Sequence, residues 1–219
     1  MPFHNRQAAY LLAIASKNFP AGTCHVILVD MFAEKTARLI LTEYNDHYFL
    51  SADNGIVPLA IGASGSSWQY FEMSVNNSYI DWLHAIGKAV KKLQFAGPGI
   101  MGLPECILKD TLRRTSQLMG SNIMECEVIH IDRYGNVVLN VTKEEINNAG
   151  ANRLFHIQFK RVEDIDTISN SYADVREGYK LARYNSNGFL EICINRGNAA
   201  SLFGLRLGGK NNDIKIIFE

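Results

Sequence analysis

A glycine- and proline-rich stretch near the middle of the chain, AGPGIMGLPE at residues 96–105, constrains the fold more than any other feature. Glycine and proline interrupt regular secondary structure and mark loops or linkers. With 219 residues the chain has room for two small domains. Helix-like and strand-like patterns alternate before this stretch, whereas strand-like patterns dominate from Cys126 onward. We therefore predict domains over residues 1–104 and 125–219, joined by a linker over 105–124.

The first domain is expected to be mixed α/β. Apolar residues between Asn5 and Ser16 recur at helical spacing, and Phe19-Pro20 ends the segment. The run CHVILV at residues 24–29 is almost wholly apolar, which predicts a strand covered on both faces. A second amphipathic helix is predicted over residues 80–93. Two strands joined by a turn at Asn45-Asp46 are expected at residues 38–44 and 47–51.

The second domain is expected to be mainly β and barrel-like, after a polar helix-like stretch around residues 108–119. Thr142 and Glu145 form a capping-box pattern that begins a short helix. Asn185 to Gly188 predicts a hairpin turn. Strands are predicted at residues 128–131, 137–141, 153–160, 180–184, 189–194 and 213–218.

Charge and hydropathy exclude several classes of function. The chain has 22 Lys plus Arg and 22 Asp plus Glu, so its net charge is zero. This balance gives no basic footprint for nucleic acid and no polybasic surface for a membrane. The sequence lacks an apolar run long enough to span a bilayer, and its start lacks a signal-peptide layout. We expect a cytoplasmic protein that contacts neither nucleic acid nor membrane.

The cysteines and histidines show no pattern typical of metal binding. None of the four cysteines has a partner at C-x-x-C spacing, and the six histidines are scattered. Cys24, Cys126 and Cys193 lie in apolar strand-like runs, which predicts buried, reduced thiols. We therefore expect neither a tight metal site nor a resident cofactor.

Four motifs point to a known family. They are FPAGTCHV with the following Val29-Asp30, YF through ADNG at residues 48–55, VIHIDRYGN at 128–136 and YNSNGFLEI at 184–192. In their order and approximate spacing they resemble the S-adenosylmethionine (SAM) hydroxide adenosyltransferase family, which also contains SAM-dependent chlorinases and fluorinases. The similarity covers nearly the whole chain. It implies a SAM hydrolase that forms adenosine and L-methionine, with SAM as substrate and not as a cofactor.

The resemblance also implies a binding site. In this family SAM lies between the N-terminal domain of one subunit and the C-terminal domain of its neighbour in a homotrimer. Asp132 and Ser186 match residues that hold the amino-acid end of SAM, since a carboxylate suits an ammonium group. Asn136 matches the residue that hydrogen-bonds adenine, because an amide carries a donor and an acceptor. Without the resemblance, Asp132 and Asn136 are ordinary turn residues. The implied SAM-binding set is completed by Tyr134, Phe3, Asn195 and Arg196.

The chain departs from the family pattern in three places. It begins at the aromatic step Pro2-Phe3, so we expect the family's opening Asp-Phe-Gly segment to be missing, through truncation or a misassigned start. Residues 31–38 replace a glycine-rich motif, which leaves Asp30 in place and Arg38 as a candidate for the family's arginine. Residues 79–84 replace the motif that supplies a catalytic histidine. There Asp81 aligns with the histidine, and His84, expected to be a partly exposed helix residue, follows one turn later.

The implied reaction is an in-line displacement at the ribose C5′ of SAM. Water attacks, and methionine leaves as a neutral thioether, so the enzyme must position and deprotonate the water. Asp30 and Asp81 are the candidate catalytic residues. Three hypotheses follow: a SAM hydrolase, a catalytically impaired protein of the same fold that binds SAM or adenosine, and a truncated product without an assembled site. Halogenation is disfavoured, because no halide-binding stretch is evident.

Overall fold

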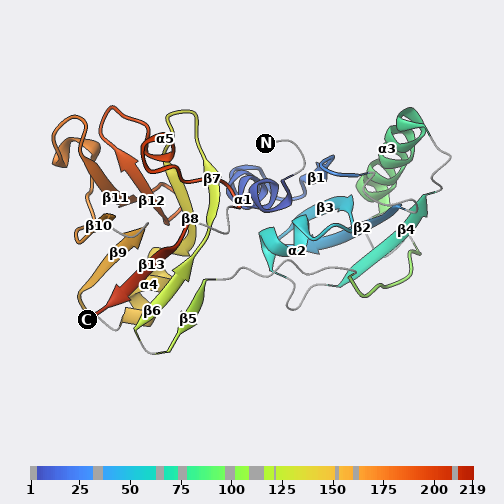
Figure 1. The fold of residues 1–219 in the computed structure, drawn as a ribbon. Helices are drawn as coiled ribbons and strands as arrows, with labels where there is room; N and C mark the ends of the chain where they lie inside the picture. Colours follow the sequence, from blue (N-terminus) through green and yellow to red (C-terminus); the bar gives the residue numbers. More distant parts are fainter. Residues whose placement is uncertain are drawn as a thin grey trace. The chain divides into compact units, whose positions relative to one another are not determined.

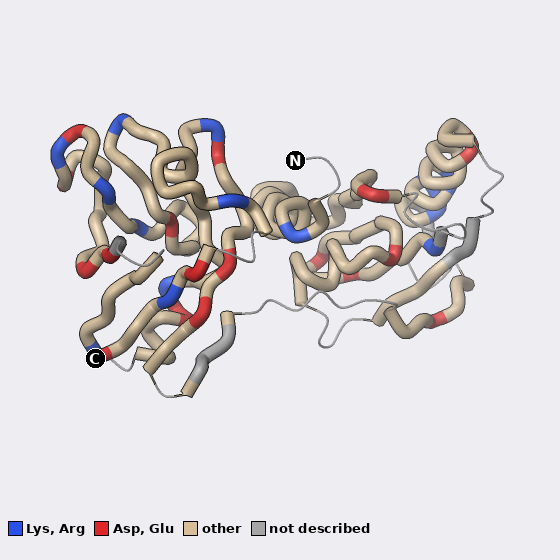
Figure 2. The backbone as a smooth tube through the Cα atoms, viewed as in Figure 1, with Lys and Arg blue, Asp and Glu red and all other residues tan. Residues whose placement is uncertain are grey.

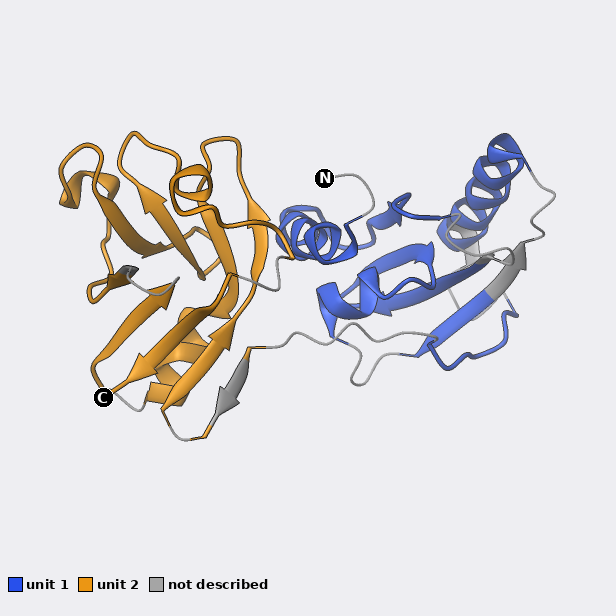
Figure 3. Cartoon of the chain, viewed as in Figure 1, with its two compact units in different colours: residues 1–113 blue, residues 114–219 orange. Residues whose placement is uncertain are grey.

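The computed structural model divides the chain into two compact units, residues 1–113 and 114–219 (Figure 3). The division falls inside the predicted linker over residues 105–124. Acidic and basic residues are interspersed in both units (Figure 2). The structure describes residues 4–31, 37–62, 67–73, 78–96, 102–108, 116–120, 122–150, 153–159, 163–208 and 212–219.

Unit 1 is a four-stranded mixed sheet with helices (Figure 1). Its strand order is β1-β3-β2-β4; β1 is parallel to β3, and the other pairs are antiparallel. The strands are β1 (Cys24–Ile27), β2 (Ala37–Tyr44), β3 (His47–Ala52) and β4 (Trp68–Met73). The helices are α1 (Asn5–Ala15), the 3₁₀ turn η1 (Ser16–Asn18), α2 (Ile56–Ile61) and α3 (Tyr79–Ala96).

Each face of this sheet has its own apolar cluster, because successive strand residues point to opposite faces. Ile40 and Phe49 pack with residues of α1 and α2. Leu39 and Leu50 pack with Trp82 and other residues of α3. Trp82 is 1% exposed, which makes it the largest fully buried side chain among the described residues.

The prediction that residues 24–29 are covered on both faces was wrong for this chain. Ile27 is buried against the α1 side, but Val26 and Leu28 on the opposite face are 37% and 44% exposed. The reason is that β1 lies at the edge of the sheet formed by the described residues, whereas the side chains that pack with α3 come mainly from β2 and β3. The predicted truncation of this domain is not confirmed by the described strands.

Unit 2 contains two sheets. The first has the strand order β10-β9-β13-β6-β5 and the second β11-β12-β8-β7, with antiparallel pairing throughout. The strands are β5 (Gln117–Met119), β6 (Ile123–Cys126), β7 (Val128–Ile131), β8 (Val137–Thr142), β9 (Phe155–Phe159), β10 (Glu163–Ile165), β11 (Lys180–Tyr184), β12 (Phe189–Ile194) and β13 (Ile214–Phe218). The helices are α4 (Lys143–Gly150), the 3₁₀ turn η3 (Tyr172–Asp174) and α5 (Ala199–Phe203).

The barrel-like description of this unit is not confirmed, because neither sheet closes on itself within the described residues. Both sheets instead contribute to one apolar core, which includes Leu139 and Ile192 from one sheet and Ile157 and Ile216 from the other. The helix expected around residues 108–119 is also corrected in part. Residues 117–119 form β5, while residues 109–115 lie outside the described part of the chain.

The predicted thiol states can be compared with the burial of each cysteine. All four cysteines are free; Cys126 and Cys193 are buried, and Cys24 is half-buried. Burial raises the pKa of the Cys126 thiol to about 12. Within the described residues, we find no helix with the length and apolar character that crossing a membrane requires.

Candidate functional site

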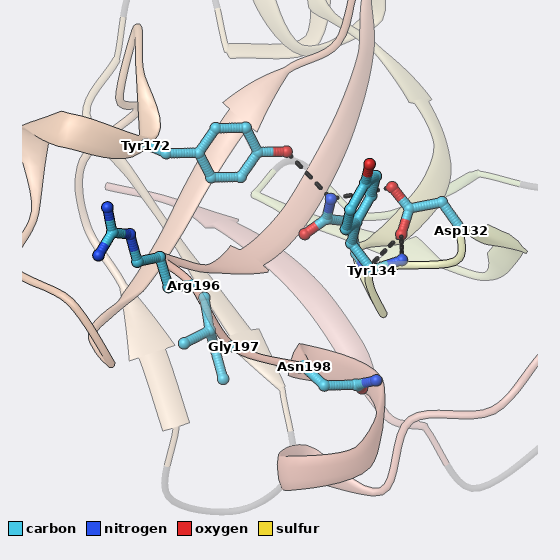
Figure 4. A pocket seen from close by; sticks show the side chains of 8 residues that line it. Asp132, Tyr134, Tyr172, Arg196, Gly197 and Asn198 are labelled. Atoms are coloured by element: carbon cyan, nitrogen blue, oxygen red, sulfur yellow. Dashed lines mark hydrogen bonds between the residues drawn. The ribbon is translucent and has the colours of Figure 1, made fainter.

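A cavity of about 700 Å³ opens in unit 2 (Figure 4). This volume lies within the range of small-molecule sites. Its walls come from the turn between β7 and β8, from η3, and from the end of β12 with the turn that leads to α5. The lining residues are Asp132, Tyr134, Asn136, Tyr172, Ile194, Arg196, Gly197 and Asn198.

Asp132 organises the turn that forms one wall. Its carboxylate Oδ1 accepts hydrogen bonds from the backbone N–H groups of Tyr134 and Asn136, both at 2.9 Å. The backbone N–H of Asp132 in turn donates to the carbonyl of Asn136 at 3.1 Å. This is the turn role that an aspartate at such a position ordinarily has, and it holds Tyr134 at the rim with 78% of its surface exposed.

Gly135 is required where this turn meets the start of α5. Its φ is +84°, and a Cβ on it would collide with the side chain of Asn198. Asn198 cannot easily move, because its Oδ1 caps α5 by accepting from the N–H of Ser201 at 2.7 Å. The carbonyl of Gly135 also accepts from the N–H of Ala200 at 2.9 Å. At Gly135 the turn between β7 and β8 therefore packs closely against the start of α5 and is hydrogen-bonded to it.

Asn136 is the buried polar group of the cavity, with 5% of its surface exposed. Its side-chain Nδ2 donates to Asp132 Oδ2 at 2.9 Å and to the Tyr172 hydroxyl at 3.0 Å. A carboxylate only accepts hydrogen bonds, so the nitrogen end of the amide must face Asp132.

Tyr172 also contacts a partly buried charged network formed by Glu191 and Arg183. The Tyr172 hydroxyl donates to Glu191 Oε1 at 3.4 Å, and Arg183 Nε lies 3.6 Å from the same oxygen. Glu191 is 6% exposed, and burial raises the pKa of its carboxyl group against the opposing effect of Arg183. Burial also raises the pKa of Tyr172. Sequence reasoning missed this network, although the charged Glu191 within the apolar run FLEICI was a signal that a partner must lie nearby.

The predicted SAM-binding residues have three outcomes: four line the cavity, two do not, and one lies outside the described residues. The structure brings Asp132, Tyr134, Asn136 and Arg196 to the cavity. Asn195 does not line it and instead donates from Nδ2 to the carbonyl of Val175 at 2.8 Å. Ser186 is exposed in the turn between β11 and β12, at the opposite end of β12 from Ile194. Phe3 lies outside the described residues.

In unit 1, Asp30 follows the end of β1, at the edge where the parallel strands β1 and β3 finish. Ligands of open α/β sheets bind at this kind of edge. Asp30 is half-buried and has a φ of +51°, which is uncommon for a residue other than glycine. Asn54, from the ADNG motif after β3, donates from Nδ2 to the carbonyls of Val29 at 2.9 Å and Asp30 at 3.4 Å. The two family motifs therefore meet at Asp30.

Arg38 lies at the start of β2 and is committed to a neighbouring carboxylate. Its Nε and Nη2 both donate to Asp53 Oδ2, and Nη2 also donates to the carbonyl of Ile107 at 2.7 Å. The guanidinium carbon lies 5.3 Å from the centre of the Tyr70 ring. These contacts hold the Arg38 guanidinium in one position, so Arg38 could orient a water molecule only from there.

Asp81 occupies the first turn of α3 and serves there as half of a capping box. Its carboxylate accepts from the backbone N–H of Ser78 at 2.9 Å and from the Ser78 hydroxyl at 2.8 Å, while Ser78 Oγ accepts from the N–H of Asp81 at 3.3 Å. These hydrogen bonds lower the pKa of Asp81. His84, one turn later, is exposed.

The fold and the cavity together define a class: an α/β unit followed by a two-sheet unit that carries a ligand-sized cavity. Comparison with known families is more specific. The SAM hydroxide adenosyltransferase N-terminal domain matches residues 1–87, and the C-terminal domain of the same family matches residues 126–211. The chain belongs to the SAM hydroxide adenosyltransferase family.

Individual relatives agree with this assignment. A protein from Methanocaldococcus jannaschii named (R)-S-adenosyl-L-methionine hydrolase is 24% identical over 218 residues, which cover 93% of this chain and 76% of that protein. A conserved protein of known structure from Thermotoga maritima superposes with a TM-score of 0.73 at 24% identity, covering 99% of this chain and 85% of its own. One from Thermus thermophilus gives 0.73 at 21% identity, covering 100% and 83%. The two structures share the fold.

Proposed function

We propose that this protein hydrolyses SAM to adenosine and L-methionine. The observation that carries the proposal is the meeting of Asp132, Tyr134 and Asn136 at one cavity of about 700 Å³, because these are the residues to which the family resemblance assigns SAM contacts. Family membership and a relative named as a SAM hydrolase support the same reaction.

The cavity offers a group for each part of an adenosyl ligand. The exposed ring of Tyr134 provides an apolar face for a purine. Asn136 supplies a hydrogen-bonding amide, and Asp132 supplies a negative charge for the ammonium of the methionine part. The Asp132 carboxylate accepts three hydrogen bonds, two from N–H groups of the backbone and one from Asn136 Nδ2. A carboxylate has about four acceptor sites, so one remains for a ligand.

The proposed reaction balances without an external oxidant or cofactor. The oxygen of a water molecule bonds to C5′ as the C5′–S bond breaks, and the electron pair stays on sulfur, which becomes a neutral thioether. The water gives up a proton, which we assign to the carboxylate of Asp30. Asp81 is the second proposed carboxylate, but it already accepts two hydrogen bonds from Ser78, and these lower its pKa and disfavour its protonation.

A second candidate function is binding of SAM or adenosine without turnover. Two observations favour it: Arg38 is committed to Asp53, and Asp81 caps α3 where the family has a catalytic histidine. For both candidate functions we propose a homotrimer in which each site lies between two subunits.

The test is incubation of the purified protein with SAM, followed by chromatography of adenosine and methionine. The proposal expects both products in equal amounts, with the rate lowered by Asp30→Ala about 10²–10⁴-fold, as for loss of a general base. Asn136→Ala should weaken SAM binding, and Glu144→Gln on the exposed side of α4 serves as the control. SAM binding without products would establish the second function, and neither binding nor products would refute both.

A further inference from the structure

Tyr172 is a cavity residue to which the family resemblance assigns no role. It comes from η3, 36 residues beyond Asn136 in the chain, and reaches the side of the cavity that faces the Asp132 turn (Figure 4). We infer that Tyr172 is a positioning residue that fixes the Asn136 amide so that only its carbonyl oxygen is offered to a ligand. The site would thereby select a purine whose edge donates a hydrogen bond.

Asn136 Nδ2 carries two hydrogens, and both are used within the protein. One is donated to Asp132 Oδ2 at 2.9 Å and the other to the Tyr172 oxygen at 3.0 Å. Because Asp132 can only accept, the amide cannot be turned over without placing its oxygen against a carboxylate. Both donors of the amide are therefore used within the protein, and Oδ1, an acceptor, is what Asn136 can present to a ligand.

The direction of the Tyr172 hydroxyl follows from the same logic. Its oxygen accepts from Asn136, so its own proton is donated onward, to Glu191 Oε1 at 3.4 Å. Arg183 compensates the charge of Glu191 from 3.6 Å, and its guanidinium carbon lies 4.9 Å from the centre of the Tyr172 ring. This cation–π contact and the buried carboxylate hold the ring in place. The hydrogen bonds thus run in one direction, from Asn136 to Tyr172 and from Tyr172 to Glu191.

The consequence is a preference for ligand chemistry, and it rests on the proposed function in that Asn136 must contact the purine. Adenine carries an exocyclic amine, which donates to Oδ1. Hypoxanthine carries a carbonyl oxygen at that position, which would face Oδ1 as a second acceptor and leave both unpaired. We expect adenosine to bind more tightly than inosine by roughly ten- to hundredfold, since one mismatched polar pair has about that effect.

Removing the Tyr172 hydroxyl tests the inference. In Tyr172→Phe one N–H of Asn136 is released and the amide keeps a single anchor, so it can twist and donate to the carbonyl of inosine. A merely structural role would weaken both nucleosides equally, whereas a positioning role changes their ratio. Tyr179→Phe is the matched control, because Tyr179 is 60% exposed and does not line the cavity.

The measurement is isothermal titration of adenosine and inosine into the full chain of the wild type, Tyr172→Phe and Tyr179→Phe, with thermal unfolding recorded for each. We expect Tyr172→Phe to unfold cooperatively and to lose at least half of the logarithmic preference for adenosine, while Tyr179→Phe keeps all of it. Adenosine binding with an unchanged preference in Tyr172→Phe would overturn the inference and leave the proposed function intact. Absence of binding by the wild type would overturn both.

Discussion

In unit 1, the partly buried Arg38 forms an ion pair with the buried Asp53, with Arg38 Nε 2.9 Å from Asp53 Oδ2. The side chains are 16% and 1% exposed. The pair connects the first residues of β2 to the loop after β3. In the same loop, Asn54 donates hydrogen bonds to the carbonyls of Val29 and Asp30. The geometry of the proposed catalytic aspartate therefore depends on a contact that the sequence did not reveal.

We predict that Arg38→Ala lowers the free energy of unfolding by about 3–5 kcal/mol, because it removes the guanidinium that faces a carboxylate only 1% exposed. Urea denaturation measures this change. Glu177→Ala is the control: it breaks an exposed pair with Arg196, in which the Arg196 and Glu177 side chains are 76% and 67% exposed, and should cost less than about 1 kcal/mol. Equal effects of the two substitutions would contradict the assigned role of the Arg38 pair.

Gly135→Ala should disrupt the cavity. The variant forces a Cβ into Asn198 at a φ of +84°, and overpacking of this kind costs about 1–3 kcal/mol beyond backbone strain. Gly178→Ala is a matched control, because Gly178 has a φ of +82° and open space around it. Scanning calorimetry and adenosine titration should show the larger loss for Gly135→Ala. Similar losses in both variants would mean that strain alone acts at this turn.

Acidification should destabilise unit 1 through His25. Its Nε2 lies 3.0 Å from His47 Nδ1, and its pKa is lowered, first by burial and then by His47. A histidine whose folded pKa lies below its unfolded value of about 6.5 contributes stability above that pH. This contribution is lost as the pH falls from about 6.5 through the folded pKa.

The variant His25→Phe keeps a ring against Phe49, whose ring centre lies 5.0 Å from that of His25, but it cannot be protonated. Thermal unfolding of this variant from about pH 8 to about pH 5 should therefore change less than that of the wild type. His84→Gln removes an exposed histidine and should leave the wild-type profile unaltered. The explanation fails if the profiles of His25→Phe and wild type run parallel.

Variants of the two capping-box residues at the start of α3 can distinguish a structural role of Asp81 from a catalytic one. Ser78→Ala removes one partner of the box, and Asp81→Ala removes the other. If Asp81 serves only the helix, both variants should lower the unfolding temperature alike and change SAM turnover alike. We expect that result, because the lowered pKa makes Asp81 a weak proton acceptor. A much larger loss of turnover in Asp81→Ala would instead assign it a catalytic role.

Local patterns predicted much of the fold, because neighbouring residues determine those features. The turn at Asn45 and Asp46 has both residues at positive φ, as an Asn-Asp turn allows. Glu145 Oε2 accepts from the N–H of Thr142 at 2.7 Å and Thr142 Oγ1 accepts in return from the N–H of Glu145, so the predicted capping box of α4 is confirmed. The helices α1 and α3 and the hairpin at residues 185–188 also follow their sequence signals.

Contacts between distant residues could not be predicted in this way. The open sheets of unit 2 depend on which strands pair, and the strands of one sheet are separated in sequence by strands of the other. Asn136 meets Tyr172 across 36 residues, and Arg38 meets Asp53 across 15. Four of the residues that the family resemblance predicted to bind SAM line the cavity. The resemblance gave no indication that Ser186 would lie at the other end of β12.

The central claim is that water displaces methionine at C5′ of SAM. Its most direct test is turnover of SAM in oxygen-18 water, with mass spectrometry of the adenosine formed. We predict that adenosine carries the heavy oxygen in its 5′-hydroxyl group and that Asp30→Ala suppresses its formation. Unlabelled adenosine, or SAM recovered unchanged with the wild type, would contradict the claim.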